Sequence, residues 1–303
     1  MRLVVGSRRS KLALLQTESV IARIREINPD IEVSISKIVT TGDKDQRIGK
    51  TPTAMFVTEL EYALLEGRID IAVHSLKDMP TELPGGLCLL AVTERLDSRD
   101  ALVAKARLNE LAAGSRIGTG SPRRSVQLMG YRPDLQVRPI RGNIDTRLGK
   151  VENGEFDGVI VAAAAMLRLG LKEKISEYLP LEHFLPAVGQ GALAIEARLD
   201  DGNIANIVSP LNHITSWQAV TTERAFLHAL GGGCRAPVAA LGTVNGNRLR
   251  LEGMVASTGG QKILRAAEEG SAESAAEIGA KLAEKMFALG AVAIIAEARN
   301  ENR

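Results

Sequence analysis

The chain has 303 residues and a net charge of +2; 45% of its residues are hydrophobic, 24% are charged and 3% are aromatic. This length exceeds what one hydrophobic core usually serves, so we expect two or three domains. The small charge excess and the scarcity of aromatic rings argue against a nucleic-acid partner. No apolar run reaches the roughly 20 residues of a membrane span, and the N-terminus does not resemble a signal peptide. We therefore expect no membrane association and a cytoplasmic location.

The first two thirds of the chain alternate strand and helix patterns. After Ser10, which can cap a helix, apolar residues recur at helical spacing until Asn28 and Pro29 interrupt them. This rhythm predicts two α/β domains, each a mostly parallel sheet with helices on both faces. The expected helices cover residues 11–27, 56–65, 121–130, 143–153 and 162–169, and the expected strands residues 3–5, 31–35, 69–73, 87–92, 101–104, 116–118, 135–140, 158–161 and 191–197.

The last third of the chain has a different pattern. A helix expected over residues 216–230 ends in a run of glycines. Three strands over 238–244, 249–257 and 262–268 follow, joined by turns at Asn245-Gly246 and Gly259-Gly260, and a helix over 272–289 closes the chain. This part is expected to be an α+β domain with an antiparallel meander.

Arginine recurs where the expected strands end, among small residues. Ligands of open α/β sheets bind outside the carboxyl ends of the strands, where helix N-termini also favour anions. Guanidinium groups bind carboxylates through paired hydrogen bonds. A solvated surface charge is the alternative for any single arginine. Together they predict a site for a polyanion, and they are Arg8 and Arg9 in GSRRS, Arg123 and Arg124 in GTGSPRRS, Arg141 and Arg147 in RGNIDTR, and Arg168 in MLRLG.

Two further segments carry reactive side chains. In HSLKDMP, Lys77 and Asp78 follow an expected buried strand, where a carboxylate can stabilise a developing cation, although a plain loop ion pair is the alternative. In GGGCRAP, Cys234 follows three glycines and precedes Arg235, which favours an exposed and reactive thiolate. Cys88 lies inside an apolar strand and is expected to be a small core filler. The four histidines show no metal-ligand spacing, so no metal site is expected.

Six motifs in this order resemble porphobilinogen deaminases: GSRRSKLALLQ, HSLKDMP, GTGSPRRSVQL, RGNIDTRL, LPAVGQGALAIE and GGGCRAPVAA. The resemblance implies two α/β domains like type-2 periplasmic binding proteins with a cleft between them, and a C-terminal α+β domain with a three-stranded antiparallel sheet. We expect the domains to cover residues 1–94 with 191–212, 95–190, and 213–303. The implied activity is hydroxymethylbilane synthase, a transferase that condenses four porphobilinogen molecules head to tail, releases ammonia at each step, and frees the linear product by hydrolysis.

The resemblance also assigns roles to residues. It implies a dipyrromethane cofactor bound covalently to Cys234 through a thioether, and Asp78 as the catalytic carboxylate. Further cofactor-binding residues would be Ser75, Lys77, Asp78, Thr119, Ser121, Arg123, Arg124, Arg147 and Gln190. Substrate-binding residues would be Arg8, Ser10, Phe56, Arg141 and Arg168. The partner is the small molecule porphobilinogen, and a monomer is expected.

This sequence departs from the family pattern before Phe56, where many relatives have a glycine- and lysine-rich run and this chain has GKTPTAM. Two other interpretations stay open. A protein that clamps a small anion between two lobes without catalysis accounts for the arginines, but not for the last domain or Cys234. A cysteine hydrolase that pairs Cys234 with a histidine is the second alternative.

Overall fold

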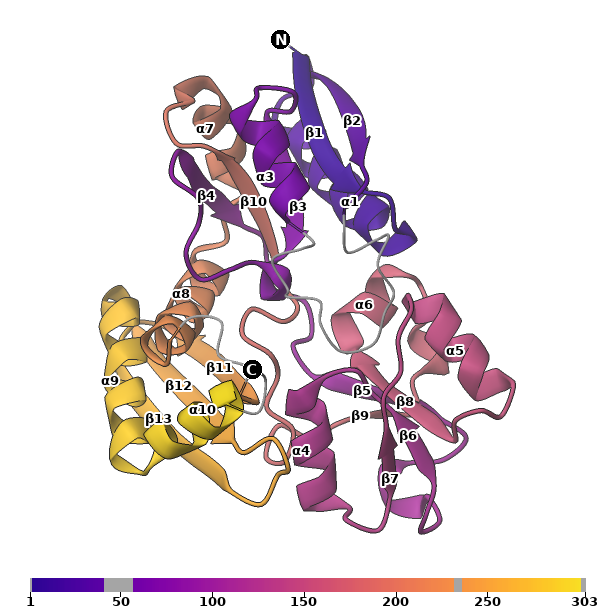
Figure 1. Cartoon of the computed structure of the whole chain (residues 1–303). Coiled ribbons are helices and arrows are strands. Elements are labelled where there is room, and N and C mark those ends of the chain that lie inside the picture. The colour runs from indigo at the N-terminus through magenta and orange to yellow at the C-terminus, as the bar shows by residue number, and fades with distance from the viewer. Residues whose placement is uncertain (1, 41–56, 232–235, 301–303) are drawn as a thin grey trace. The chain divides into compact units, whose positions relative to one another are not determined.

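The computed structural model describes residues 2–40, 57–231 and 236–300; for residues 299 and 300 it describes the main chain alone. The chain forms two compact units, which we call the first unit (residues 1–96 and 191–217) and the second unit (residues 97–190 and 218–303) (Figure 1). Among the described residues, no helix combines the length and apolar character that crossing a membrane requires.

The first unit is built on a five-stranded sheet of order β2-β1-β3-β10-β4. β1 runs parallel to β2 and β3, whereas β10 runs antiparallel to β3 and β4. β10 is the strand formed when the chain returns from the second unit. The strands are β1 (Arg2–Arg8), β2 (Glu32–Ile38), β3 (Ile71–Ser75), β4 (Leu87–Val92) and β10 (Leu193–Arg198).

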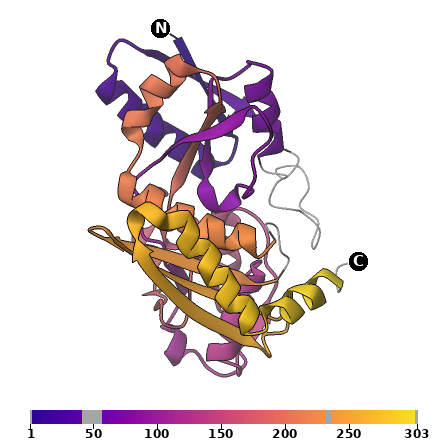
Figure 2. The same ribbon diagram turned by 90° about the vertical axis from the view of Figure 1, so that its left-hand side faces the viewer.

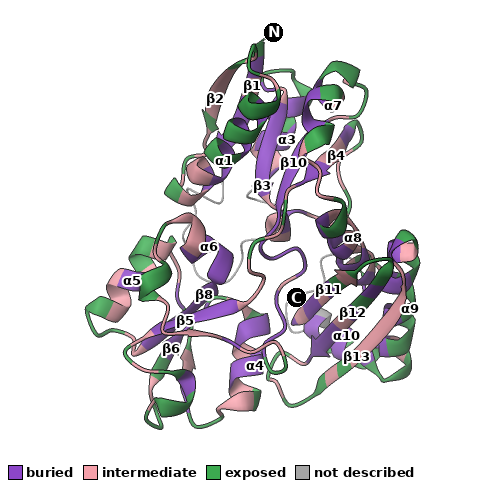
Figure 3. Cartoon of the chain, turned by 180° about the vertical axis from the view of Figure 1, so that it is seen from behind, coloured by how far each residue is buried: buried purple, intermediate pink, exposed green. Residues whose placement is uncertain are grey.

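Helices cover both faces of this sheet. α1 (Lys11–Ile27) and α7 (Gly202–Val208) place Ile24 and Ile204 in one core with Val73 of β3. α3 (Thr58–Leu65) packs Leu60 against Ala72 on the opposite face. Figure 3 shows β3 and β10 largely buried between these layers.

The second unit contains a sheet of order β7-β6-β8-β5-β9. α4 (Pro122–Tyr131) packs on one face, and α5 (Ile144–Glu152) and α6 (Ala163–Arg168) pack on the other. β6 is parallel to β7 and β8, and β5 is antiparallel to β8 and β9. The strands are β5 (Asp100–Ala104), β6 (Arg116–Gly118), β7 (Gln136–Arg138), β8 (Gly158–Ala162) and β9 (Glu177–Tyr178).

The expectation of mostly parallel sheets is wrong for both of these sheets, since parallel and antiparallel pairs are equally frequent in each. The cause is local. β5 and β10 each follow a passage of the chain from one unit to the other, and each enters its sheet against the direction of its neighbours.

A third sheet, of order β11-β12-β13, is an antiparallel meander as expected. Its strands are β11 (Val238–Asn245), β12 (Arg248–Ala256) and β13 (Ile263–Ser271). α8 (Ile214–Ala229), α9 (Ala275–Ala288) and α10 (Ala291–Asn300) contribute to its core, and Figure 2 shows α9 lying across the strands. Val126 of α4 and Met254 of β12 share a smaller core, so the second and third sheets pack together within the second unit.

Most expected elements are present with shifted ends. The helix expected over 11–27 has those bounds, because Ser10 caps it by accepting a hydrogen bond from the Ala13 N–H at 3.3 Å. Gly67 follows α3 with a φ of 69°, a conformation that favours glycine. The sequence analysis missed α7, α10 and the short β9.

Candidate functional site

The segment after β3 presents Asp78 on a short turn. β3 ends at Ser75, and Leu76–Asp78 form a single 3₁₀ turn. Oγ of Ser75 accepts a hydrogen bond of 2.9 Å from Nε2 of Gln16 on α1, and the Leu76 N–H donates to the Ala192 carbonyl at 3.1 Å. The turn is therefore held by α1 and by the segment that leads into β10, while the Asp78 side chain is partly exposed.

Arg8 lies at the same edge of the first sheet as this turn. β1 and β3 are parallel neighbours, with Gly6 opposite Ala72, so the carboxyl ends of both strands lie at one edge. Arg8 ends β1 and is partly exposed, as is Lys77 in the turn. Ser10, an expected hydrogen-bond donor to a ligand, caps α1. The first unit thus brings five of the predicted site residues to one edge, which are Arg8, Ser10, Ser75, Lys77 and Asp78.

The second unit contains a buried ionic cluster at the start of α4. Nη1 of Arg123 donates to Oδ2 of Asp100 at 2.7 Å and to the Leu185 carbonyl at 2.7 Å. Nε and Nη2 of Arg124 donate to Oδ1 of the same carboxylate at 2.9 and 2.8 Å. The side chain of Asp100 is 0% exposed, and those of Arg123 and Arg124 are 6% and 7% exposed. The two arginines therefore bind a carboxylate of the protein itself.

The charges in this cluster stabilise one another. Burial by itself would raise the pKa of Asp100, but the attraction of Arg123 and Arg124 and their hydrogen bonds hold this pKa well below its usual range. Burial lowers the pKa of Arg123, and the charge of Asp100 opposes that shift. In the folded protein, Asp100 is therefore ionised at ordinary pH.

Gln190 completes the cluster. Its Nε2 donates to Oδ1 of Asp100 at 2.8 Å and to the Ser98 carbonyl at 2.9 Å, and its Oε1 accepts from Nη2 of Arg124 at 3.3 Å. Gln190 is 1% exposed. The amide therefore fixes the orientation of the Arg124 guanidinium as well as that of Asp100.

Arg141, Arg147 and Arg168 have a different environment. All three are partly exposed. Nε of Arg147 donates to the Gly142 carbonyl at 2.8 Å, and its two Nη atoms make no hydrogen bond to the described residues. Burial lowers the pKa of Arg147 to about 10, with contributions from the charges of Arg124 and Arg141, and burial lowers that of Arg168 to about 10. An anion placed beside Arg147 would offset both the repulsion and the cost of desolvation of its guanidinium.

Two turns beside these arginines require glycine. A Cβ on Gly120 would lie 2.8 Å from the Ile140 carbonyl, and Gly142 has a φ of 105°. Thr119 and Ser121 flank the first of these turns. Oγ1 of Thr119 accepts from the Ser121 N–H at 3.2 Å, and Ser121 caps α4. The strand-to-helix turns predicted from the sequence are thus present.

The structure brings the predicted residues of the second unit to the carboxyl ends of β6, β7 and β8, which are parallel neighbours. Thr119, Ser121, Arg123 and Arg124 follow β6, Arg141 follows β7, and Arg168 lies in the helix after β8. Phe56 and Cys234 lie outside the described residues.

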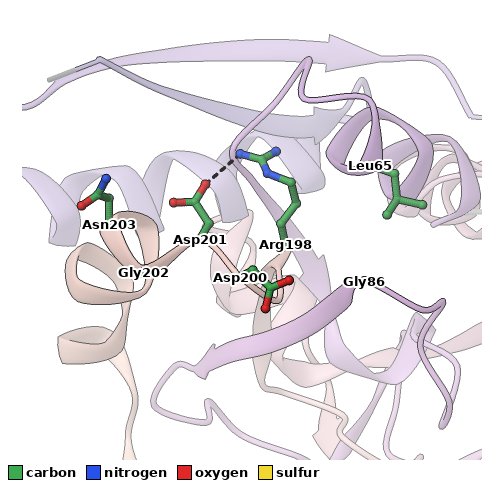
Figure 4. Close-up of a pocket in the computed structure, with 7 residues that line it drawn as sticks. All are labelled: Leu65, Gly86, Arg198, Asp200, Asp201, Gly202 and Asn203. Carbon is green, nitrogen blue, oxygen red and sulfur yellow. Dashed lines mark hydrogen bonds and ion pairs between the residues drawn. The ribbon is translucent and has the colours of Figure 1, made fainter.

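A shallow pocket of about 380 Å³ lies at the other edge of the first sheet (Figure 4). In this pocket Nη2 of Arg198 is 2.9 Å from Oδ2 of Asp201. Arg198 ends β10, whose opposite end pairs Leu193 with Ser75, so the pocket is remote from the Asp78 turn. Its lining includes none of the predicted site residues.

Sequence reasoning missed Asp100 and Glu196. Both are fully buried, Asp100 with two arginines and Glu196 with His74. A signal was present, since each is a lone acidic residue next to or within an apolar strand pattern. A carboxylate in such a position is rarely buried without a cationic partner.

The chain was compared with known protein families. Residues 3–206 match the family model "Porphobilinogen deaminase, dipyromethane cofactor binding domain", and residues 217–288 match "Porphobilinogen deaminase, C-terminal domain". The chain belongs to the porphobilinogen deaminase family. Curated porphobilinogen deaminases similar to it include that of Pelotomaculum thermopropionicum, 45% identical over 99% of this chain and 98% of the relative. That of Thermus thermophilus is 46% identical over 98% of this chain and 99% of the relative.

Solved structures with a similar chain path include the methionine-binding protein MetQ. It shares 12% sequence identity over 73% of this chain and 93% of that chain, with a TM-score of 0.44. A periplasmic sulfonate-binding protein from Methylobacillus flagellatus shares 13% identity over 74% of this chain and 67% of that chain, with a TM-score of 0.40.

Proposed function

We propose that this porphobilinogen deaminase is a hydroxymethylbilane synthase that condenses four porphobilinogen molecules head to tail on a dipyrromethane primer. Each condensation forms a carbon–carbon bond between two pyrrole units and releases ammonia, and water then releases the linear tetrapyrrole. The observation that carries the proposal is the match of two porphobilinogen deaminase models to residues 3–206 and 217–288, between them most of the chain.

We propose that Asp78 is the catalytic carboxylate. It lies on a turn at the carboxyl end of β3, anchored through Ser75 and Leu76, so its main chain is held while its side chain is accessible. A fixed carboxylate stabilises the cation that forms on the substrate as ammonia departs, and it does so best where water is excluded.

We propose that Arg141, Arg147 and Arg168 bind the acetate and propionate groups of the cofactor and substrate. Burial lowers the pKa of Arg147 and of Arg168 to about 10, so the charged form of each side chain is costly to keep. A ligand carboxylate bound to either guanidinium group would offset that cost. In the first unit, we propose the same role for Arg8, with hydrogen bonds from Ser75 and Lys77. Thr119, Ser121, Ser10 and Gln190 are proposed to support these contacts.

For Arg123 and Arg124 the structure favours another role than the one expected. Both guanidinium groups bind the carboxylate of Asp100, and their side chains are 6% and 7% exposed. Each also donates to a main-chain carbonyl, Arg123 to that of Leu185 and Arg124 to that of Ile160. We propose that the two arginines hold Asp100 in place. A ligand carboxylate at either arginine would have to compete with a buried ion pair.

We propose that Cys234 carries the cofactor through a thioether bond. The described residues fit the group in charge, because each unit by itself carries strand-end guanidinium groups that match its negative side groups. When bound, the dipyrromethane supplies the pyrrole carbon to which the first substrate is joined. Phe56 is proposed to contact the substrate. The division into three domains at residues 94, 190 and 212, a monomeric state and a cytoplasmic location complete the proposal.

The test is the activity itself. The purified chain, incubated with porphobilinogen, should release one ammonia for each porphobilinogen consumed and accumulate a linear tetrapyrrole that loses water and cyclises to uroporphyrinogen. Binding of porphobilinogen without ammonia release would instead support a two-lobed anion-binding protein. Activity towards a peptide or ester that depends on Cys234, without ammonia from porphobilinogen, would support a cysteine hydrolase.

A further inference from the structure

Three ionisable side chains are buried together in the first unit, and the proposed mechanism uses none of them. His74, Glu196 and Glu61 are 4%, 0% and 7% exposed. Nε2 of His74 lies 2.9 Å from Oε2 of Glu196. We call these three residues the buried triad.

Strand register places the triad under α3. Glu196 of β10 pairs with Ala72 of β3, and His74 pairs with Ala194, so Glu196 and His74 project from the same face as Ala72. Ala72 packs in the core with α3, the helix that carries Glu61. All three side chains therefore occupy one layer, between α3 and the centre of the sheet.

The triad lacks the hydrogen bonds that full ionisation would need. Oε1 of Glu196 and Oε1 of Glu61 are both buried, and neither has a hydrogen-bond partner among the described residues. Burial, and next the charge of Glu196, raise the pKa of Glu61 to about 6, while His74 acts in the opposite direction. A proton on Glu61 turns its carboxyl group into a hydrogen-bond donor, and the carboxylate of Glu196 can then accept that bond.

Other charged groups near the triad come from each neighbouring element. On α3 itself, Glu59 lies two residues before Glu61. On β1 the charged group is Arg8, which by strand alternation shares the side of Gly6 that packs against Leu60. On β4, Cys88 pairs with Ala197, the residue after Glu196; burial and next the charge of Glu196 raise the pKa of that thiol. Asp70 and Arg198, at the far end of β3 and β10, pair at 3.4 Å.

The triad lies next to the start of the Asp78 turn. His74 directly precedes Ser75, the residue from which the 3₁₀ turn Leu76–Asp78 starts. The Leu76 N–H donates to the carbonyl of Ala192, just before the strand that carries Glu196. The bond between His74 and Glu196 therefore joins the two strands next to the hydrogen bonds that hold the turn, those of Ser75 and of Leu76.

We propose that Glu61, acting through Glu196 and His74, is a positioning residue whose proton sets how firmly the Asp78 turn is held. The proposal rests on the assignment of Asp78 as the catalytic carboxylate. Protonated Glu61 donates a hydrogen bond to Glu196, which keeps its bond to His74. Ionised Glu61 places two carboxylates together in a buried layer, and their repulsion loosens the end of β3.

The test uses the cofactor-loaded enzyme and the variant Glu61→Gln, which keeps the size and a donor but cannot lose a proton. Hydrogen exchange of the Leu76 amide is measured from pH 5 to 7.5 and expressed as protection relative to the intrinsic rate. The wild type should lose protection by about tenfold through pH 6, and Glu61→Gln should stay protected. The matched control Glu66→Gln follows α3 directly, where Glu66 is exposed and bound to Arg68, and it should behave as the wild type.

Turnover supplies a second readout. The ratio of kcat for Glu61→Gln to that of the wild type should rise about threefold between pH 5 and 7.5, with KM for porphobilinogen unchanged. Equal pH profiles of Leu76 protection in the wild type and Glu61→Gln would overturn the proposal. If Glu61→Gln does not fold, Glu196→Gln, which keeps an acceptor for His74, should likewise abolish the pH dependence. Failure of the wild type to convert porphobilinogen would refute the proposed function, yet the Leu76 protection could still be read.

Discussion

Arg124 donates two hydrogen bonds, from Nε and Nη2 at 2.9 and 2.8 Å, to a single oxygen of Asp100. Arg123 holds the other oxygen of that carboxylate, and no part of the Asp100 side chain is exposed. The carboxylate therefore fixes the orientation of both guanidinium groups.

Replacing Asp100 tests this arrangement. Asp100→Asn keeps the shape but leaves two buried guanidinium groups without a counter-charge, so the free energy of unfolding should fall by about 3 kcal/mol. Urea denaturation measures the change. The matched control is Asp134→Asn, which breaks an exposed pair with Arg132 and should have a much smaller effect. Equal effects of the two variants would show that the buried cluster contributes no more than a surface pair.

Acid should weaken the same cluster. The pKa of Asp100 lies well below its usual range in the folded chain, so its stabilising contribution is present above the unfolded-state value near 3.8 and is lost as the pH falls below it. The difference in unfolding free energy between wild type and Asp100→Asn should therefore shrink as the pH is lowered from 5 towards 3. A difference that stays constant over this range would contradict the assigned ionisation.

Glu61 should show the opposite dependence. Its pKa rises from 4.5 to about 6 on folding, so between these values the folded chain binds more protons than the unfolded chain, and stability falls as the pH rises. Glu61→Gln should become more stable relative to the wild type over pH 4.5 to 6. The comparison is made on protein without cofactor by urea denaturation, and a difference that does not change with pH would refute the burial of an ionisable Glu61.

Arg147 and Arg123 should respond differently to the same substitution. Arg147→Met removes a partly exposed guanidinium that burial and two neighbouring arginines disfavour, so the stability of the free enzyme should be unchanged or slightly higher. KM for porphobilinogen, or the extent of cofactor assembly, should worsen by about tenfold. Arg123→Met should instead destabilise the fold by about 3 kcal/mol, because it leaves Asp100 buried with one partner fewer. The reverse pattern would exchange the two roles.

Asp78 carries the prediction that is closest to the chemistry. Asp78→Asn should fold, because the turn is held by main-chain and Ser75 contacts rather than by the carboxylate. It should lose about 100-fold or more in kcat, since an amide cannot balance the charge of the cation. Single-turnover kinetics with the loaded variant measure the effect. A kcat close to that of the wild type would remove Asp78 from the mechanism.

The sequence predicted the strand-end turns and most elements, because Ser10, the Gly120 turn and Gly142 act locally. It could not predict the direction of β5 and β10, since this depends on how the chain passes between the two units. Nor could it predict that Arg123 would be occupied internally, because its partner Asp100 is 23 residues away and the pairing exists only after β5 and α4 pack. The same holds for Glu196 and His74, which are 122 residues apart.

The most direct test of the central claim is the intact mass of the purified, folded protein. We expect the wild type to exceed the mass of its sequence by two pyrrole units, and Cys234→Ser to show no such excess. A wild-type protein that carries nothing on Cys234, even after incubation with porphobilinogen, would contradict the account.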